Sequence, residues 1–398
     1  MIFAVVLPVL VGGTGFAVDS AAFYHQQGKM QSVADSAALA VAKELHIYRD
    51  DLDELKAVGE ARAEALLAEV GLAASPHALT VGINPTVNLI RVELSMTAES
   101  VLPVGFWHQA PIVVTSEARA FGRSRLCVLA LHDNKSDTIK ADGQSLLTAP
   151  DCAVQSNSTD PKGLNVAGDS QIVSSAICTS GGYDGDSGSF TPSPETDCPP
   201  LEDPLAERQP PALSGCTVND LVIDSSENLT GDAVFCGGLK IEKGAIVTLG
   251  PGIYVISGGK LEVKDNAQLI GENVSIYFAD DAATFDFDKD TTIDLTAPKD
   301  GPLAGILFFE NPAASPGRDF VIKSENARRL LGTIYLPNAK LKIDTQADVA
   351  AESAYTVIVA SQLDVKGANL VVNADYGGTD VPVPEGLGPH SSMVRLER

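Results

Sequence analysis

The hydrophobic pattern of the chain repeats at a nearly constant spacing. Within residues 238–270 the order apolar, apolar, small, apolar occurs twice, first as Leu239, Ile241, Ala245 and Val247 and then, 22 residues later, as Leu261, Val263, Ala267 and Leu269. Comparable copies begin at Ile139, Leu164, Phe285, Leu341 and Leu363, with a second short apolar strand between copies. A period in the twenties is typical of a solenoid in which each repeat forms one coil.

The repeat predicts a mainly β fold whose largest part, residues 125–374, is a right-handed parallel β-helix. The chain is expected to climb one coil per repeat, so that equivalent residues stack about 4.8 Å apart. A leucine-rich repeat has a similar length but its Leu-x-x-Leu-x-Leu motif is absent, and a β-sandwich does not explain the register. Residues 181–215, rich in Gly, Ser and Pro, are predicted to form an excursion on the surface, and residues 375–398 a disordered tail.

The amino-terminal end is apolar and uncharged up to Asp19. A helix of 18 residues spans roughly 27 Å, which just crosses the hydrocarbon core of a bilayer. We expect an uncleaved transmembrane anchor over residues 1–18. A cleaved signal peptide is the alternative, although this stretch has neither a basic n-region nor a clear small-x-small cleavage site.

Two helices and a small sheet are predicted between the anchor and the solenoid. In the alanine-rich segment after Asp19, apolar residues recur at helical spacing, and a second helix is expected from about residue 51 to residue 70, with Gly71 as its C-cap. Alternating residues on both sides of Asn84-Pro85 predict a hairpin, and residues 111–121 a third strand. We assign residues 19–71 to a helical segment and residues 72–124 to a small β domain.

Charge and cysteine content narrow the class of protein. Lys and Arg total 28 against 52 Asp and Glu, a formal net charge of −24, which disfavours binding to nucleic acid. An even number of cysteines without a Cys-x-x-Cys pair favours disulfides, and hence an oxidising compartment, over free thiols or a metal site. Residues one coil apart are within disulfide distance, so among the possible pairings we prefer 127–152, 178–198 and 216–236. The candidates are Cys127, Cys152, Cys178, Cys198, Cys216 and Cys236.

One segment resembles a known family. The matching stretches are "LPVL" from Leu7, "GFAVD" from Gly15, and "MQ" at Met30 leading into "ADSAALA". They resemble the amino-terminal segment of the TadG-like family of Tad (tight adherence)/Flp pilus assembly proteins. The motif residues are Pro8, Gly15, Asp19, Gln31, Ala34, Asp35, Ala37 and Ala38. More loosely, "PLAGILFFENP" and "GTIYLPNAKLKI" resemble the carboxy-terminal part of longer members.

Catalysis is the main competing hypothesis, because a parallel β-helix is also the scaffold of polysaccharide lyases and hydrolases. The densest group of carboxylates is Asp280, Asp281, Asp286, Asp288 and Asp290, which as a set offers an acid–base pair or calcium ligands. Since Asp286 and Asp288 alternate with Phe285 and Phe287, we interpret these aspartates as a solvated face. The six histidines are scattered without ligand spacing. We predict no catalytic residue, no cofactor and no bound metal.

The resemblance implies a bacterial envelope protein that acts in pilus biogenesis. We therefore expect a non-enzymatic, pilin-like or accessory subunit in Tad/Flp pilus assembly and adhesion. It is expected in the inner membrane, single-pass, with its bulk in the periplasm or at the cell surface. Other Tad/Flp proteins, the inner membrane and a surface glycan are the candidate partners, and nucleic acid is not. The alternative is a membrane-anchored, carbohydrate-active β-helix enzyme.

Overall fold

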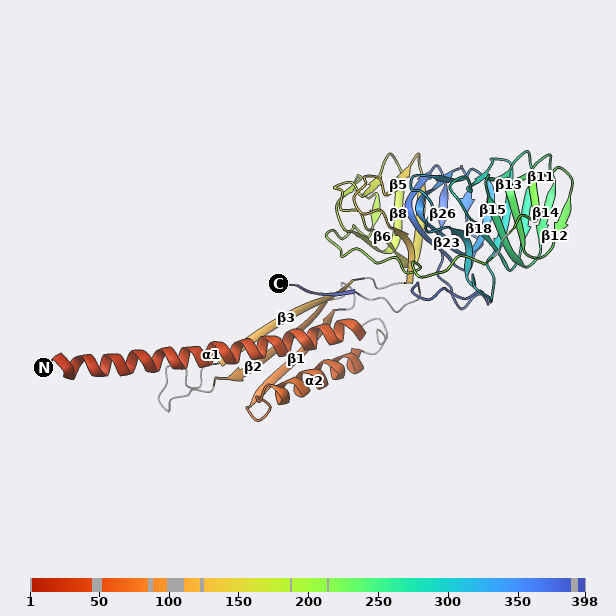
Figure 1. Cartoon of the computed structure of the whole chain (residues 1–398). Helices are drawn as coiled ribbons and strands as arrows, with labels where there is room; N and C mark the ends of the chain where they lie inside the picture. The colour runs from red at the N-terminus through yellow and green to blue at the C-terminus, as the bar shows by residue number, and fades with distance from the viewer. Residues whose placement is uncertain are drawn as a thin grey trace. The chain divides into compact units, whose positions relative to one another are not determined.

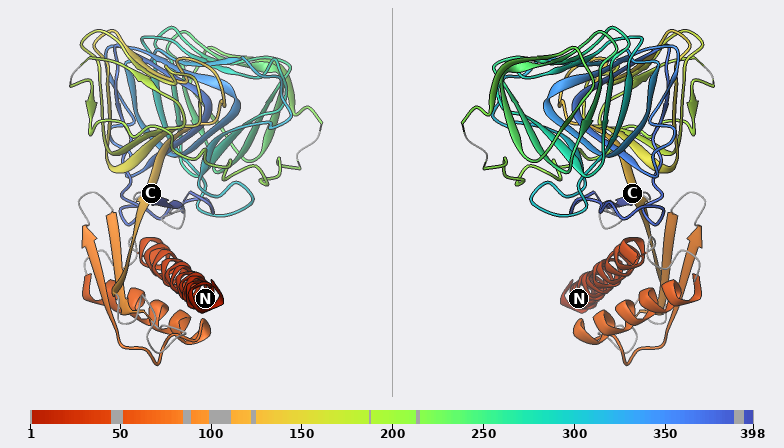
Figure 2. Two further views of the ribbon diagram at one scale, coloured as in Figure 1. Left: turned by 90° about the vertical axis from the view of Figure 1, so that its left-hand side faces the viewer. Right: turned by 90° about the vertical axis from the view of Figure 1, so that its right-hand side faces the viewer.

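The protein is mainly β, with two helices and a large sheet of parallel strands (Figure 1). The structure is a computed structural model that describes residues 2–44, 52–84, 89–98, 111–121, 125–186, 188–212, 215–387 and 393–397. The chain divides into two compact units (Figure 2). Met1–Phe121 with Ser392–Arg398 is called here the amino-terminal unit, and Gly122–Ser391 the β unit.

The amino-terminal unit combines two helices with a four-stranded antiparallel sheet. Its elements are α1 (Ile2–Glu44), α2 (Leu52–Glu69), β1 (His77–Asn84), β2 (Leu89–Thr97), β3 (Pro111–Phe121) and β27 (Met393–Glu397). The strand order is β1-β2-β3-β27. The predicted hairpin and third strand are confirmed, because β1 pairs with β2 and β2 with β3, both antiparallel.

The two helices and the sheet share one core. Met30 and Val41 of α1, Leu55 of α2, and Ile90 and Val92 of β2 are completely buried in it. The expected division between a helical segment and a separate β domain is therefore wrong. An apolar helix face has to be covered, and here the sheet covers it.

The predicted end of the second helix is confirmed. Gly71 has a φ of 78°, and the N–H of Leu72 donates to the carbonyl of Leu67 at 2.8 Å. This bond closes the last turn of α2 in the way that a left-handed glycine permits. The predicted first residue of this helix, residue 51, lies outside the described residues.

The described residues of the carboxy-terminal segment belong partly to the β unit and partly to the amino-terminal unit. β27 pairs antiparallel with β3 and so completes the sheet of the amino-terminal unit. Val381 and Leu387 are buried against the β unit, and the hydroxyl of Tyr355 donates to the carbonyl of Pro382 at 2.6 Å. The prediction of a disordered tail over 375–398 is wrong for these residues, because its scattered apolar side chains find partners far away in the sequence.

The β unit consists of short strands whose registered pairs are parallel. They are β4 (Arg125–Ala130), β5 (Ile139–Asp142), β6 (Leu146–Ser156), β7 (Leu164–Val166), β8 (Gln171–Thr179), β9 (Tyr183–Asp184), β10 (Phe190–Thr191), β11 (Val218–Ile223), β12 (Glu227–Leu229), β13 (Ala233–Ile241), β14 (Ile246–Leu249), β15 (Gly252–Ser257), β16 (Leu261–Val263), β17 (Gln268–Gly271), β18 (Val274–Phe278), β19 (Phe285–Phe287), β20 (Thr292–Thr296), β21 (Ile306–Glu310), β22 (Asp319–Ile322), β23 (Asn326–Asp344), β24 (Asp348–Val349), β25 (Thr356–Lys366) and β26 (Asn369–Val371).

The sequence repeat is the register of these strands. Leu239 pairs with Leu261, and Leu261 pairs with Phe285. Val247 likewise pairs with Leu269. All five side chains are buried, so equivalent apolar positions stack directly on one another, as the repeat predicts.

Successive repeats of parallel strands, called here coils, do not pair in the order of the sequence. Ile358 of β25 pairs in parallel with Val128 of β4, and Leu363 pairs with Ile139 of β5. In Figure 1 the blue strands β23 and β26 accordingly lie between the yellow strands β5, β6 and β8 and the green strands β11 to β14. The expectation of a continuous climb is wrong at one junction: after β10 the chain returns to the opposite end of the stack to begin β11.

The return is made by residues 199–212, called here the crossing segment. The Asn157 side chain donates to the carbonyl of Leu201 at 2.7 Å and accepts from its N–H at 2.9 Å. The hydroxyl of Tyr335 donates to Asp203 at 2.8 Å, and Leu205 is buried in the core of the β unit. The predicted excursion is thus confined to its second part, because β9 and β10 still pair with β7 and β8.

Candidate functional site

Small side chains are buried along the second half of α1, in the core that it shares with α2 and the sheet. Ala34, Ala37 and Ala38, three of the motif residues, are completely buried. The Cβ that a residue at Gly59 of α2 would carry lies 2.7 Å from Cγ2 of Val41. Alanine and glycine at these positions therefore allow the two helices to approach closely. The family-like pattern in this part of the chain has a packing role.

One polar motif residue, Gln31, connects the helix to β3 and also bonds to a second motif residue, Asp35. The side-chain amide of Gln31 donates to Oδ1 of Asp35 at 2.8 Å and to the carbonyl of Thr115 at 3.2 Å. Nearby, the ammonium of Lys29 donates to the carbonyl of Val70, just after α2, at 3.1 Å. These bonds fix the rotation of α1 about its axis relative to the sheet and α2.

Two apolar side chains nearer the start of α1 are exposed. Pro8 and Gly15 lie in it, and Asp19 is buried. Phe16 and Val18 are about half exposed, at 46% and 51%. Within the part of the chain that the structure describes, no helix is long and apolar enough to cross a bilayer. The motif residues thus lie along one helix, whose second half is packed and in which Phe16 and Val18 are about half exposed.

The aspartates considered for catalysis bond within the β unit. Asp280 accepts from the hydroxyl of Ser257 and from the N–H of Gly258, both at 2.7 Å. Asp281 accepts from the hydroxyl of Ser315 at 2.7 Å, and this bond lowers its pKa.

The Phe–Asp alternation next to them points the two residue types in opposite directions. Phe285 and Phe287 are buried and stacked at 4.5 Å between ring centroids. Asp286 forms an ion pair with Lys323 at 3.1 Å. The two phenylalanines therefore point into the core and Asp286 points away from it, as the interpretation of this stretch requires.

A buried ion pair is the feature that the sequence analysis missed. Glu310 is completely buried and occupies the register position of Phe278 one coil earlier. It pairs with Arg318, and its carboxylate accepts from the N–H of Asn338 at 2.9 Å. Burial raises the pKa of Glu310 to about 7, although Asn338 and Arg318 act in the opposite direction. The only sequence signal is a glutamate at the end of the apolar run "ILFFE".

Arg318 is held from several sides. It donates to the carbonyls of Asp280 and Ala283, at 2.8 and 3.2 Å, and its guanidinium lies 5.8 Å from the ring centroid of Phe320. The pair therefore connects three successive coils. This arrangement is structural, since both groups bond to the protein itself.

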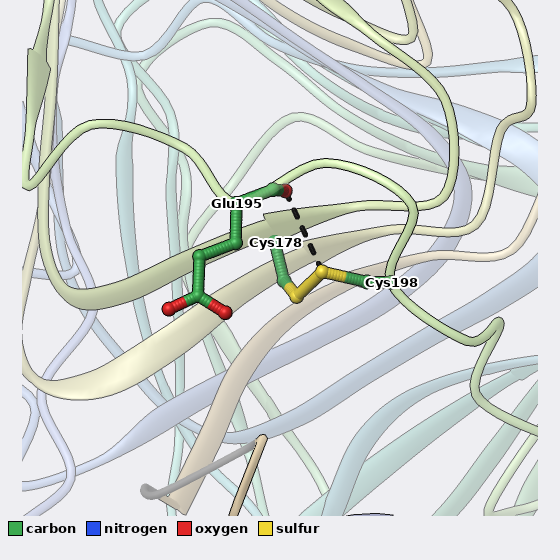
Figure 3. A group of neighbouring side chains, drawn as sticks. All are labelled: Cys178, Glu195 and Cys198. Carbon is green, nitrogen blue, oxygen red and sulfur yellow. Dashed lines mark hydrogen bonds between the residues drawn. A yellow bond between two sulfur atoms is a disulfide. The ribbon is translucent and has the colours of Figure 1, made fainter. Parts of the chain in front are cut away.

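The cysteines form the three predicted disulfides. Cys127–Cys152, Cys178–Cys198 and Cys216–Cys236 have Cα–Cα distances of 5.5, 6.0 and 5.6 Å. A cluster of possible metal ligands, formed by Cys178, Cys198 and Glu195, includes one of them (Figure 3). Sulfur atoms in a disulfide are not thiolates, so this cluster does not fit a metal ion.

One open cavity of about 490 Å³ lies at a corner of the coils. Its lining includes Asp232, Asp300 and Lys299 together with three prolines. Asp232 accepts from the N–H of Ile253 at 2.7 Å, and Lys299 pairs with Asp380 at 3.2 Å. Two of its charged groups are therefore engaged in holding the corner.

The comparison with known proteins gives a match only for the part of the chain that contains α1. Residues 1–44 match the model of the Tad family, described as Flp pilus-assembly TadE/G-like. The matched range includes all of α1 and none of the β unit. No curated protein and no solved structure matches the chain.

Proposed function

We propose that the protein is a non-enzymatic subunit in Tad/Flp-type pilus assembly or adhesion at the bacterial envelope. The observation that carries the proposal is the match of residues 1–44 to a pilus-assembly family, in a segment that folds as one helix. The buried motif residues of α1 hold the helix in the core of the amino-terminal unit, while Val18, at 51% exposure, presents an apolar side chain to its environment. That environment is the inner membrane or the helices of other Tad/Flp proteins.

The β unit is, in this proposal, a parallel β-helix exposed in the periplasm or at the cell surface. The parallel register from coil to coil and the three disulfides support it, since disulfides persist in oxidising compartments. A rigid stack of coils presents long ladders of outward side chains, which suit an extended partner such as a surface glycan.

The role of the helix can be separated into anchoring and recognition. Deleting residues 2–18 should release the protein from the membrane fraction after carbonate washing and abolish pilus-dependent attachment of the cells. A matched control carries the same residues 2–18 in permuted order, which preserves hydropathy but moves Pro8 and Gly15. This control should remain in the membrane fraction and still fail to support attachment. Normal attachment by the deletion variant would contradict the proposal.

The absence of catalysis needs its own test, because the cavity and the aspartates are the places where a polysaccharide-cleaving activity would reside. Purified protein should release no reducing ends from pectate or alginate, with or without calcium. Depolymerisation by the wild type would establish the enzyme alternative if it is lost when Asp280, Asp281, Asp286, Asp288 and Asp290 are all replaced by asparagine.

A further inference from the structure

The β unit consists of two parts that the crossing segment connects. The first part, residues 125–198, contains β4 to β10, and the second part, residues 216–371, contains β11 to β26. The two parts meet where β25 pairs in parallel with β4 and β5, and where β26 pairs with β6. One stack of coils is thus assembled from two stretches of chain.

No disulfide links the two parts. Cys127–Cys152 and Cys178–Cys198 both lie within the first part, and Cys216–Cys236 lies within the second. The structure describes all six cysteines, and these three bonds use every one of them. A cut in the crossing segment would therefore produce two chains without a covalent bond between them.

The contacts between the two parts are strand pairs with buried apolar side chains. Leu363 pairs with Ile139, and Leu370 pairs with Leu147. All four side chains are buried. In addition β27, which follows the second part in the sequence, pairs with β3, which precedes the first. Backbone hydrogen bonds and apolar burial would therefore hold the two chains together after a cut.

Residues 206–212 are the accessible stretch of the crossing segment. The structure describes each of them, none belongs to a strand, and most are exposed. Their backbone bonds only to the adjacent turn: the N–H of Ala206 donates to the carbonyl of Asp203 at 3.3 Å, and that of Arg208 to the carbonyl of Leu205 at 2.9 Å. Exposed loops with few backbone hydrogen bonds are the preferred sites of proteolytic cleavage.

Arg208 is the one basic residue of the crossing segment. Its side chain lines an open cavity of about 510 Å³ and forms no ion pair with any residue that the structure describes. Arg328 and Arg329, which lie in β23, both pair with carboxylates. An endopeptidase whose specificity pocket carries a carboxylate selects an arginine side chain. Arg208 therefore combines the charge that such an enzyme recognises with an accessible backbone.

We propose that Arg208 is a processing site, at which an arginine-specific endopeptidase converts the protein into two chains that remain assembled. Water adds to the peptide bond between Arg208 and Gln209, which leaves a carboxylate on the first chain and an amine on the second. The first chain contains α1 and the first part of the β unit, and the second chain contains the second part and β27. After the cut, the second chain can be exchanged without reduction of a disulfide. The proposal does not depend on the pilus role.

The test treats the full-length protein with an arginine-specific endopeptidase and identifies the fragments by mass spectrometry. A fragment that begins at Gln209 should appear before any fragment from a cut after Arg328 or Arg329, because a cut in β23 requires this strand to leave the sheet. The fragment should separate from the first chain on a non-reducing denaturing gel, yet elute with it in native size-exclusion chromatography. Arg208→Gln should abolish it.

A matched control joins the two parts covalently. Lys140 and Asp364 are opposite each other in the pairing of β5 with β25, and both are half-buried. Residues opposite each other in a parallel pair are within disulfide distance, so Lys140→Cys together with Asp364→Cys should form a bond between the parts. The same peptide bond should be cut in this variant, but the two chains should stay together on the non-reducing gel.

Three results would overturn the proposal. A cut after Arg328 or Arg329 that precedes the cut after Arg208 would show that the crossing segment is not the accessible site. Absence of a cut after Arg208, under conditions in which the unfolded protein is cut there, would show that the folded protein protects this bond. Separation of the two chains in native chromatography would show that the strand pairs do not hold them together.

Discussion

The burial of Glu310 should make the stability of the β unit depend on pH in a defined direction. In the unfolded chain this carboxyl ionises near its ordinary pKa of 4.5, whereas in the folded protein burial raises the pKa to about 7. Between these values the folded state binds more protons than the unfolded state. The contribution of Glu310 to stability is therefore fully present below the unfolded pKa and is lost as the pH rises through the folded one.

The size of the effect follows from the two pKa values. Each pKa unit corresponds to about 1.4 kcal/mol, so the complete loss is about 3 kcal/mol, of which about 2 to 3 kcal/mol falls between pH 5 and pH 8. Glu310→Gln keeps the size of the side chain and removes the titration. We expect the free energy of unfolding of this variant, relative to that of the wild type, to rise by the same amount over this range.

Urea unfolding followed by circular dichroism at pH 5 and pH 8 measures this difference. Glu325→Gln is the matched control, because Glu325 is exposed and pairs with Lys289 at 3.2 Å on the surface. Its effect on the free energy of unfolding should stay constant with pH within about 0.5 kcal/mol. A constant difference for Glu310→Gln as well would refute the reasoning, and would mean that Arg318 keeps Glu310 ionised at both pH values.

Substitutions and one deletion test three other parts of the structure. Gly59→Ala should destabilise the amino-terminal unit by about 1 to 3 kcal/mol, because its Cβ would lie 2.7 Å from Val41. Gly28→Ala has open space around it and should stabilise α1 by up to about 1 kcal/mol. Equal shifts of the melting temperature in the two variants would contradict this. Replacing Cys216 and Cys236 by serine opens a link across 20 residues and should cost about 3 kcal/mol in urea unfolding; an unchanged midpoint would argue against the bond. Deleting β27 should expose β3 to limited proteolysis, and unaltered resistance would show that the strand is dispensable.

Features that depend on local pattern could be predicted from the sequence. The 22-residue spacing between Leu239 and Leu261 is the strand register itself, because a parallel stack buries equivalent positions together. The disulfides followed for the same reason, since cysteines about one coil apart are brought within bonding distance. The small residues of α1 were visible as a motif, but the sheet that covers them includes β27, which lies far away in the sequence. No periodicity links a helix near residue 37 to a strand near residue 395.

The buried pair of Glu310 and Arg318 could not be predicted for a related reason. A single glutamate after an apolar strand is most often a solvated residue, and an arginine eight positions later has no fixed relation to it outside a helix. Only the loop between β21 and β22 brings the two side chains together. Long-range placement and loop conformation decide such contacts, and both depend on the assembled coils.

The crossing segment sets the order of the coils, because it is just long enough to reach from one end of the stack to the other. Any copy of the apolar repeat can pair in parallel register with any other copy. Leu363, for example, pairs with Ile139 on one side and with Leu341 on the other, and both pairs join two apolar residues. From the bridge at Glu195 to β11, successive parallel pairings span about ten strand spacings, or about 48 Å. The chain from Cys198 to Cys216 reaches about 60 Å when fully extended. The segment therefore crosses the stack with little slack, and its prolines, which favour extended backbone and cannot continue a ladder, suit that path. Disulfides to coils at opposite ends of the stack fix both of its ends.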